Sequence, residues 1–312
     1  MTARAAVLAC LLIVAYSSVA AAQQTYVLLV TGVPGDEEHA KMFSEWAKTF
    51  LDAAKKKEGV PEANITYLSE HGATRAAVEK AFADIGAKAH ANDELFVLLI
   101  GHGSFDGTTA AFNLMGPDLT AEDYARLLSK FTAQRVVFVN TSSSSGAFLK
   151  PLAAPGRVIV TATKTGGERN DTDFPRYFVA AFADDAADRD RNGHVSVAEA
   201  FEYAKTKVVQ SFSQKGLLLT EHATLEDSGE GQLASAVFLS GAQGRSALQV
   251  DTSDPELRAL AEQKDALDRQ IAALRAKKAT MDPGAYDAEM EQLLTALALK
   301  TKEIRDLQAK KK

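Results

Sequence analysis

Two short motifs contain the residue types needed for acid–base and nucleophilic chemistry. His102 lies in the motif GHGS, directly after the apolar run Glu94–Ile100. Four serines, Ser142–Ser145, follow the apolar residues of RVVFVN and precede a glycine. An imidazole can accept a proton near neutral pH, and a serine hydroxyl can attack a carbonyl carbon once a base activates it. The two motifs therefore predict a site in which His102 meets one of the serines.

The residues before each motif have the composition of a buried strand. Val136–Val139 are too few for a helix and too apolar for a half-exposed strand, which indicates a central strand of a covered parallel sheet. Glu94–Ile100 has the same character. Neighbouring parallel strands place their carboxyl ends along one edge of the sheet, where ligands bind. Both motifs are expected at that edge.

This order of strands and motifs resembles the legumain and caspase superfamily of cysteine peptidases (clan CD), over the segment from Tyr26 to Gly241. In that superfamily a His-Gly pair follows one strand, and Cys-x-Ser-Gly follows the next. Here the first motif matches His102-Gly103, and the second matches the segment 143–146, reading SSSG. The resemblance implies a caspase-like fold and places Ser143 where the family has its nucleophilic cysteine.

The resemblance also implies roles for individual residues. The catalytic positions are His102 and Ser143. In an active serine enzyme, the backbone N–H groups near Gly103 and Ser143 would form the oxyanion hole. The substrate-binding residues are Ser145, Thr163 and Lys164, the last two in the loop after the predicted strand Arg157–Thr161. Ser142 is an alternative nucleophile, because an ungapped motif match carries an error of about one position.

Two features that would support catalysis or substrate binding are not evident in this sequence. No acid is placed so that it obviously orients His102. The family also uses a basic residue just after its first strand to hold a substrate side chain, whereas the segment Gly35–His39 contains no arginine. Its acidic residues are interpreted as the solvated start of a helix, where they face the positive end of the helix dipole.

The only cysteine is Cys10, and it lies in a predicted signal peptide, residues 1–22. Arg4 precedes an apolar stretch, and a run of alanines before Gln23 provides a cleavage site. Cleavage predicts a secreted or periplasmic protein without any thiol, and therefore without a cysteine nucleophile or a disulfide. The apolar stretch is too short for a membrane span, so no transmembrane segment is expected in the mature chain.

Residues 188–199, reading DRDRNGHVSVAE, have the spacing of an EF-hand calcium loop. The predicted ligands of Ca²⁺ are the side chains of Asp188, Asp190, Asn192, Ser196 and Glu199 and the backbone carbonyl of His194. Carboxylate, amide and carbonyl oxygens are the donors that Ca²⁺ prefers, and the glycine in the middle allows a sharp turn. The alternative is a solvated, aspartate-rich loop that only caps the next helix.

Strands and helices alternate along the main domain, 23–241. We expect strands at Tyr26–Val30, Ile65–Leu68, Glu94–Ile100, Val136–Val139 and Arg157–Thr161, separated by amphipathic helices. This alternation predicts an α/β fold with a parallel-dominated sheet covered by helices on both faces. The segment Phe105–Asp118 is expected to be a loop or short hairpin over the site, and 221–231 an acidic, glycine-rich loop.

A linker, residues 242–254, precedes a tail, 255–312, rich in Ala, Leu, Glu and Lys. Apolar residues recur there at steps of three and four, and Asp282-Pro283-Gly284 interrupts the pattern. This predicts an antiparallel helical hairpin with a coiled-coil seam. Each half is short, so the hairpin is expected to dock on the main domain, on a second copy of the chain or on a partner.

Three hypotheses for the function follow. The formal net charge of −6, without a basic stripe, argues against nucleic acid as a partner. The first hypothesis is a calcium-binding pseudo-peptidase that binds a peptide or protein ligand. The second is an active hydrolase that uses a Ser143–His102 dyad. The third is an α/β binding module unrelated to peptidases, which predicts no deep cleft at the strand ends, whereas the first two predict one.

Overall fold

The computed structural model describes residues 23–91, 93–131, 134–228, 232–239, 254–275 and 281–311. The predicted signal peptide and residues 242–253 of the predicted linker lie outside the described residues. The main domain and the helical tail lie largely within them.

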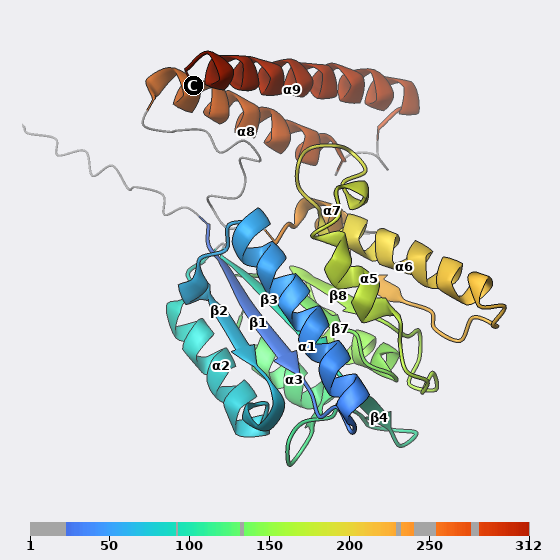
Figure 1. Cartoon of the computed structure of the whole chain (residues 1–312). Helices are drawn as coiled ribbons and strands as arrows, with labels where there is room; N and C mark the ends of the chain where they lie inside the picture. Colours follow the sequence, from blue (N-terminus) through green and yellow to red (C-terminus); the bar gives the residue numbers. More distant parts are fainter. Residues whose placement is uncertain are drawn as a thin grey trace, which may run out of the picture.

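A six-stranded sheet forms the centre of the main domain, in the order β2-β1-β3-β7-β8-β9 (Figure 1). All pairs from β2 to β8 are parallel, and β9 is antiparallel to β8. The bounds are β1 Thr25–Thr31, β2 Ile65–Leu68, β3 Glu94–Ile100, β7 Arg135–Asn140, β8 Arg157–Thr161 and β9 Thr224–Glu226. The predicted parallel-dominated sheet is confirmed.

The strand β9 corrects the sequence analysis, which expected a loop at 221–231. Its three residues, Thr224–Glu226, are all only partly buried. A segment this short shows no useful period in the sequence. Its pairing with β8, in which Val160 lies opposite Leu225, is what makes it a strand.

Helices cover both faces of the sheet (Figure 1). On one face lie α1 Glu37–Asp52, which continues as a π-helical turn Ala53–Lys57, α5 Phe174–Ala181, α6 Val197–Gln214 and α7 Gln232–Ala236. On the other lie α2 Arg75–Lys88, α3 Ala121–Leu128 and α4 Leu149–Leu152. Successive strand residues point to opposite faces, so Val27 packs in the first layer and Leu28 in the second. The predicted coverage of both faces is confirmed.

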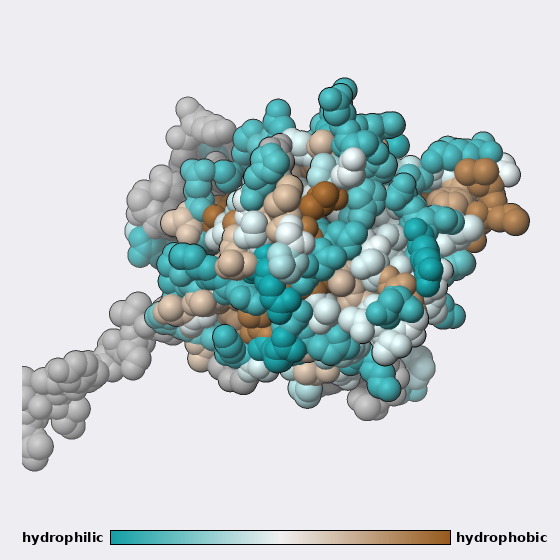
Figure 2. All heavy atoms as spheres, turned by 90° about the horizontal axis from the view of Figure 1, so that it is seen from below, coloured by the Kyte–Doolittle hydropathy of each residue, from teal (hydrophilic) through white to brown (hydrophobic). Residues whose placement is uncertain are grey.

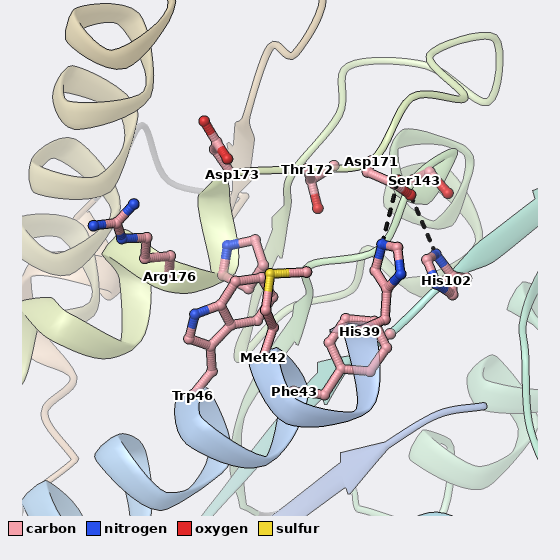
Figure 3. A pocket seen from close by; sticks show the side chains of 12 residues that line it. His39, Met42, Phe43, Trp46, His102, Ser143, Asp171, Thr172, Asp173 and Arg176 are labelled. Atoms are coloured by element: carbon pink, nitrogen blue, oxygen red, sulfur yellow. Dashed lines mark ion pairs between the residues drawn. The ribbon is translucent and has the colours of Figure 1, made fainter. Parts of the chain in front are cut away.

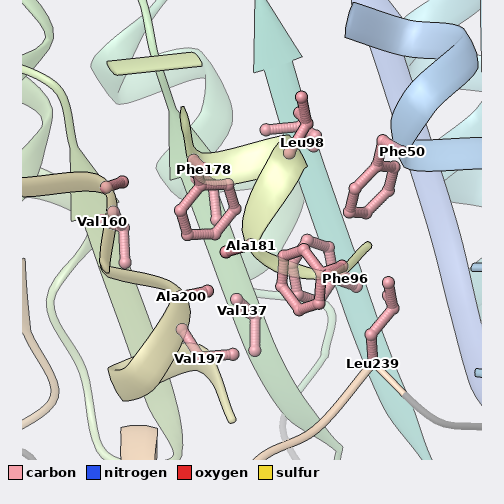
Figure 4. Close-up of a cluster of buried hydrophobic side chains, with 14 of the residues drawn as sticks. Phe50, Phe96, Leu98, Val137, Val160, Phe178, Ala181, Val197, Ala200 and Leu239 are labelled. Atoms are coloured by element: carbon pink, nitrogen blue, oxygen red, sulfur yellow. The ribbon is translucent and has the colours of Figure 1, made fainter. Parts of the chain in front are cut away.

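The core under α1 and α5 is rich in aromatic side chains (Figure 4). Phe50 of α1 lies against Phe96 of β3 and Phe182, with ring centroids 5.5 and 5.7 Å away, and all three are fully buried. Burying each such side chain stabilises the fold by about 1.5–3 kcal/mol. This packing holds α1 and α5 rigidly on the sheet, and the starts of these two helices lie beside the ends of β3 and β7.

A small antiparallel sheet follows β3, made of β4 Gly103–Phe105, β5 Ala110–Phe112 and β6 Leu119–Thr120. It agrees with the loop or short hairpin expected for Phe105–Asp118. Thr120 then caps α3: its hydroxyl accepts from the Asp123 N–H, and the Asp123 carboxylate accepts from the Thr120 N–H. Such a reciprocal cap satisfies two N–H groups that a helix start leaves unpaired.

The tail folds as predicted into two helices, α8 Pro255–Arg275 and α9 Pro283–Lys311, which pack against each other above the main domain (Figure 1). Asp282, predicted as part of a helix break, caps α9 by accepting from the Ala285 N–H at 3.0 Å. Proline at the first position of a helix is favourable because its missing N–H would have no partner there. In the described part of the chain, no helix is both long and apolar enough to cross a membrane.

Candidate functional site

A cavity of about 220 Å³ opens where β3 and β7 end, as the sheet topology predicts (Figure 3). It is lined by His39, Met42, Phe43 and Trp46 of α1, Gly101 and His102 after β3, Ser143 after β7, and 171–173, Pro175 and Arg176 around the start of α5. Figure 2 views the molecule from the side of these strand ends, where hydrophobic residues lie in small areas among hydrophilic ones. His102 and Ser143 are therefore brought to one cavity.

Within it, however, His102 and Ser143 have other partners. The Ser143 hydroxyl donates to the Gly103 carbonyl at 3.1 Å and accepts from the Gly103 N–H at 3.3 Å. Nε2 of His102 lies 3.0 Å from the Pro34 carbonyl oxygen, and Nδ1 lies 3.3 Å from Oδ1 of Asp171. Among the described residues, no hydrogen bond joins Ser143 to His102. The structure places the two predicted catalytic positions side by side without pairing them.

Asp171 is an acid beside His102, which the sequence analysis did not identify. It comes from the segment between β8 and α5, far from His102 in the sequence, and its carboxylate lies between the rings of His102 and His39 (Figure 3). Only the fold brings these segments together. The one available signal was an aspartate in a loop between a buried strand and a helix. Many residues without a function occur in the same context, so this signal is not specific.

His39 is the second residue that the sequence analysis missed, because the start of α1 was interpreted as solvated. Nδ1 of His39 lies 2.8 Å from Oδ2 of Asp36, and Nε2 lies 3.4 Å from Oδ2 of Asp171. The hydrogen bond that the His39 ring donates to the Asp36 carboxylate raises the pKa of His39, and the charge of Asp171 raises it further. Asp36 itself is the N-cap of α1, accepting from the His39 N–H. The acidic helix start therefore orients a ring into the cavity.

Gly103 brings the two strand ends into direct contact. A Cβ atom there would overlap the Ser143 carbonyl oxygen and the Ser142 hydroxyl. The next residue after Ser143, Ser144, has a left-handed backbone with φ 58°. This conformation is unfavourable for a residue other than glycine and is held by the surrounding structure. The described contacts give Gly103 a packing role, and its N–H already has the Ser143 hydroxyl as its partner.

The predicted substrate-binding residues lie in a neighbouring layer. Ser145 and Thr163 are buried, their hydroxyl oxygens 3.2 Å apart, and the Thr163 hydroxyl accepts from the Gly146 N–H. Lys164 is exposed, and its N–H donates to Glu168. None of these three residues is among the described residues that line the cavity. Ser145 and Thr163 connect the loops that follow β7 and β8.

A second polar site is the acidic loop, 188–199, between α5 and α6. Ligand atoms of Asp188, Asp190 and Glu199 all lie within 4.8 Å of one another. The loop turns through hydrogen bonds from its backbone: the Gly193 N–H donates to Asp188 and the His194 N–H to Asn192, both at 2.8 Å. The structure thus gathers the three predicted carboxylate ligands.

The other predicted ligands lie in the same turn. Ser196 is the N-cap of α6 and forms a capping box with Glu199. His194 is predicted to contribute only its backbone carbonyl, and its ring Nδ1 lies 3.6 Å from the buried Glu58 carboxylate. Burial raises the pKa of Glu199 and of Asp188, and the nearby Asp190 carboxylate raises both further. Carboxylates that oppose one another's ionisation in this way favour a bound cation.

Glu221 holds the segment that carries Asp171. Its carboxylate accepts from the N–H groups of Asp173 and Phe174, both at 2.8 Å, at the start of α5. Burial raises the pKa of Glu221 to about 7, although these two hydrogen bonds lower it. A buried acid thus replaces the missing cap side chain of α5 and fixes the position of the residues just before the helix.

Residues 79–226 match the sequence profile of the Peptidase C13 family, the family of legumain. The predicted resemblance to the legumain peptidases is confirmed. The matched range contains His102, Ser143, Asp171 and the acidic loop, whereas His39 precedes it. No curated protein matches the chain significantly.

Solved structures with a similar course of the chain include a protein from Geobacter sulfurreducens and the Drosophila initiator caspase Dronc. The first is 14% identical with a TM-score of 0.45, over 65% of this chain and 92% of the other. The second is 10% identical with a TM-score of 0.46, over 65% of this chain and 79% of the other.

Proposed function

We propose that this chain is a pseudo-peptidase: a legumain-like domain that binds a peptide or protein ligand without cysteine-peptidase catalysis. The observation that carries the proposal is the separation of Ser143 from His102 by their other hydrogen-bond partners. A serine hydroxyl is far less acidic than a thiol and needs an aligned base to become a nucleophile. Neither ring nitrogen of His102 is directed at the Ser143 hydroxyl to accept its proton.

The cavity supports the binding of a ligand. Met42, Phe43 and Trp46 form an apolar wall on α1, and Asp171, Asp173 and Arg176 form a charged rim on the other side. Apolar walls with a few converging polar groups are typical of ligand sites. We infer that the ligand is a peptide that inserts an apolar side chain against this wall. The hypothesis of an unrelated α/β module is disfavoured, since it predicts no cleft here.

We also propose that the acidic loop binds Ca²⁺. The gathered carboxylates of Asp188, Asp190 and Glu199 support this, and the side chain of Asn192 lies in the same turn. A single loop without a partner loop is expected to have a structural role more than a sensing one. Removal of Ca²⁺ would leave the three carboxylates without a counter-charge.

The protein is further proposed to act outside the cytoplasm, secreted or periplasmic, after cleavage of the signal peptide 1–22. The lack of any cysteine after Cys10 is compatible with an oxidising compartment but does not require one. The helical hairpin α8–α9 is proposed as the part that docks on a partner or on a second copy. Among its described residues, two leucines are exposed, Leu294 and Leu299.

One observation favours a second candidate, the active serine hydrolase. Asp171 lies 3.3 Å from Nδ1 of His102, where a serine–histidine–aspartate triad has its acid. Release of Nε2 from the Pro34 carbonyl oxygen, together with a turn of the Ser143 hydroxyl, would complete such a triad. The two candidates differ in whether that rearrangement occurs when a ligand binds.

Activity profiling separates them. The mature chain is treated with a serine-directed fluorophosphonate and with a broad peptide library, with and without Ca²⁺. The variants are Ser143→Ala and His102→Ala, and Ser213→Ala, at an exposed serine of α6, is the matched control. The pseudo-peptidase predicts no labelling or cleavage while peptides still bind. Labelling that both site variants lose and the control retains would overturn it in favour of the hydrolase.

A further inference from the structure

Three metal-binding side chains converge at the cavity, each from a different element (Figure 3). His39 comes from the start of α1, His102 follows β3, and Asp171 precedes α5. One ligand atom of each lies within 4.8 Å of the other two. Two imidazoles and one carboxylate are a donor set for divalent transition metals, found in catalytic zinc sites and in non-haem iron sites.

The outward nitrogens of both rings are held by acceptors. The Pro34 carbonyl oxygen can only accept, so Nε2 of His102 carries a proton, and in the neutral ring Nδ1 has its lone pair toward Asp171. The Asp36 carboxylate, 2.8 Å from Nδ1 of His39, likewise accepts from that nitrogen, so that the lone pair of Nε2 is directed inward in the neutral ring. Metal-binding histidines almost always have such an outer partner, which sets the tautomer and the ring orientation.

The two inward contacts of Asp171 are made by different carboxylate oxygens, Oδ2 toward Nε2 of His39 and Oδ1 toward Nδ1 of His102. The contacts of Asp171 with His39 and His102 are 3.4 and 3.3 Å, longer than the 2.7–2.9 Å expected of charge-assisted hydrogen bonds. Two ligand atoms bound to a tetrahedral Zn²⁺ at about 2.0–2.1 Å lie about 3.3–3.4 Å apart. Each contact thus has the length of one edge of a zinc tetrahedron, and one ligand atom of each of the three residues lies within 4.8 Å of the other two.

We propose that His39, His102 and Asp171 form a binding site for Zn²⁺, with a fourth position open to the cavity. The side chains of His39 and His102 are 21% and 26% exposed, so an ion can reach them from solvent. Imidazole nitrogen favours Zn²⁺ over Ca²⁺, which takes oxygen ligands, so this site is distinct in selectivity from the acidic loop.

This inference does not rest on the proposed function. As a zinc ligand, His102 would have its inward lone pair occupied and would not serve as a base for Ser143. The open position would face Met42, Phe43 and Trp46, where a water or a ligand carboxylate fits. The histidine of the peptidase motif would thus take part in a metal site in a chain that has no cysteine at the nucleophile position.

Zinc titration of the full mature chain tests the proposal. The protein is stripped with a chelator and titrated with Zn²⁺ by calorimetry in excess Ca²⁺, which saturates the acidic loop. We expect one equivalent of Zn²⁺ in the wild type and a loss of affinity of about 100-fold or more in His39→Ala, His102→Ala and Asp171→Asn. The matched control is His222→Ala, because His222 also pairs with a carboxylate, that of Glu168, at 2.8 Å.

A fourth variant isolates the outer partner without disturbing the fold. Asp36→Asn keeps an N-cap side chain of equal quality. It replaces the oxygen beside Nδ1 of His39 with an amide donor, which disfavours the inward lone pair. Zinc affinity should fall about 10–100-fold, with an unchanged melting temperature in the metal-free state.

Three results would overturn the proposal. One is the absence of saturable zinc binding, which would leave the cluster as protonated histidines paired with Asp171. Another is zinc binding that the three ligand variants retain. The last is a loss of zinc affinity in His222→Ala as large as that in the three ligand variants. Substitution with Co²⁺ gives a second readout, since its visible spectrum reports imidazole and carboxylate ligands in the wild type and should disappear in the three ligand variants.

Discussion

The acidic loop and the histidine cavity both gather ligand atoms, but they are built in different ways. The loop takes its donors from residues 188–199, and the backbone of the same segment forms the turn. The cavity takes His39, His102 and Asp171 from three segments that only the packing of α1 and α5 on the sheet brings together. A local site can be recognised in the sequence, whereas an assembled one depends on every contact between its elements.

The two sites also differ in what balances their charges. In the loop, burial and neighbouring carboxylates raise the pKa of Asp188 and Glu199. In the cavity, each ring has an acceptor outside the cluster and one shared acid within it. The cation proposed for the loop is therefore one that prefers oxygen ligands, and the cation proposed for the cavity is one that prefers nitrogen. Disturbing one site should leave the other intact.

The largest effect is expected where the assembled site depends on close backbone contact. In Gly103→Ala, the new Cβ would overlap the Ser143 carbonyl oxygen. Overpacking of this kind should lower the free energy of unfolding by about 3 kcal/mol or more. Urea denaturation measures it, with Gly72→Ala as the control because nothing lies within 4 Å of a Cβ there. Equal stability of the two variants would contradict the close contact, and calcium binding by the folded fraction should persist.

The next effect concerns the carboxyl group that holds the Asp171 segment. Burial raises the pKa of Glu221 from its ordinary value of 4.5 to about 7. The folded state thus keeps a proton that the unfolded state has already lost, so stability present below pH 4.5 is lost as the pH rises through about 7. The shift corresponds to about 3 kcal/mol.

Denaturation between pH 4.5 and 8 in excess Ca²⁺ measures this loss. Glu221→Gln keeps an acceptor for one of the two N–H groups and does not titrate, so its stability should vary less over the same interval. If the wild type and the variant have parallel pH profiles, Glu221 ionises normally in the folded protein. Subtracting the profile of the variant from that of the wild type cancels the pH dependence that other groups, such as His39, contribute to the free energy of unfolding.

Breaking the local site should have a somewhat smaller effect. Bound Ca²⁺ at 100 times its dissociation constant stabilises the folded state by about 2.7 kcal/mol. Glu199→Gln should lose this increment while keeping the capping box with Ser196, since glutamine serves equally in that motif. The melting temperature with and without Ca²⁺ measures the increment. If the melting temperature of the wild type does not change on addition of Ca²⁺, the loop only caps α6.

The smallest effect is expected at Ser143 itself. Ser143→Ala removes hydrogen bonds to Gly103 and should lower the free energy of unfolding by about 1 kcal/mol. Ser145→Ala should cost more, about 1–3 kcal/mol, because it leaves the buried Thr163 N–H without its acceptor. A larger loss at Ser143 than at Ser145, measured by urea denaturation, would mean that Ser143 contributes more to the assembled site than its hydrogen bonds indicate.

Several features were determined by the sequence alone. The runs Glu94–Ile100 and Arg135–Asn140 are buried strands because their apolar residues can be satisfied only under two helical layers. The acidic loop and the break at Asp282-Pro283 were equally evident, since their geometry depends on neighbours in the chain. The meeting of His102 and Ser143 at one edge also followed, from the rule for parallel strand ends.

Only the tertiary structure decided the partners at that edge. His39 and Asp171 lie on segments whose own sequences indicate no more than a helix start and a polar loop. The hydrogen bonds that separate Ser143 from His102 likewise depend on where the Pro34 carbonyl and the Gly103 backbone come to lie. Local patterns specify elements, because the backbone and nearby side chains decide them. Contacts between distant segments depend on how the helices pack on the sheet, and no local pattern contains that information.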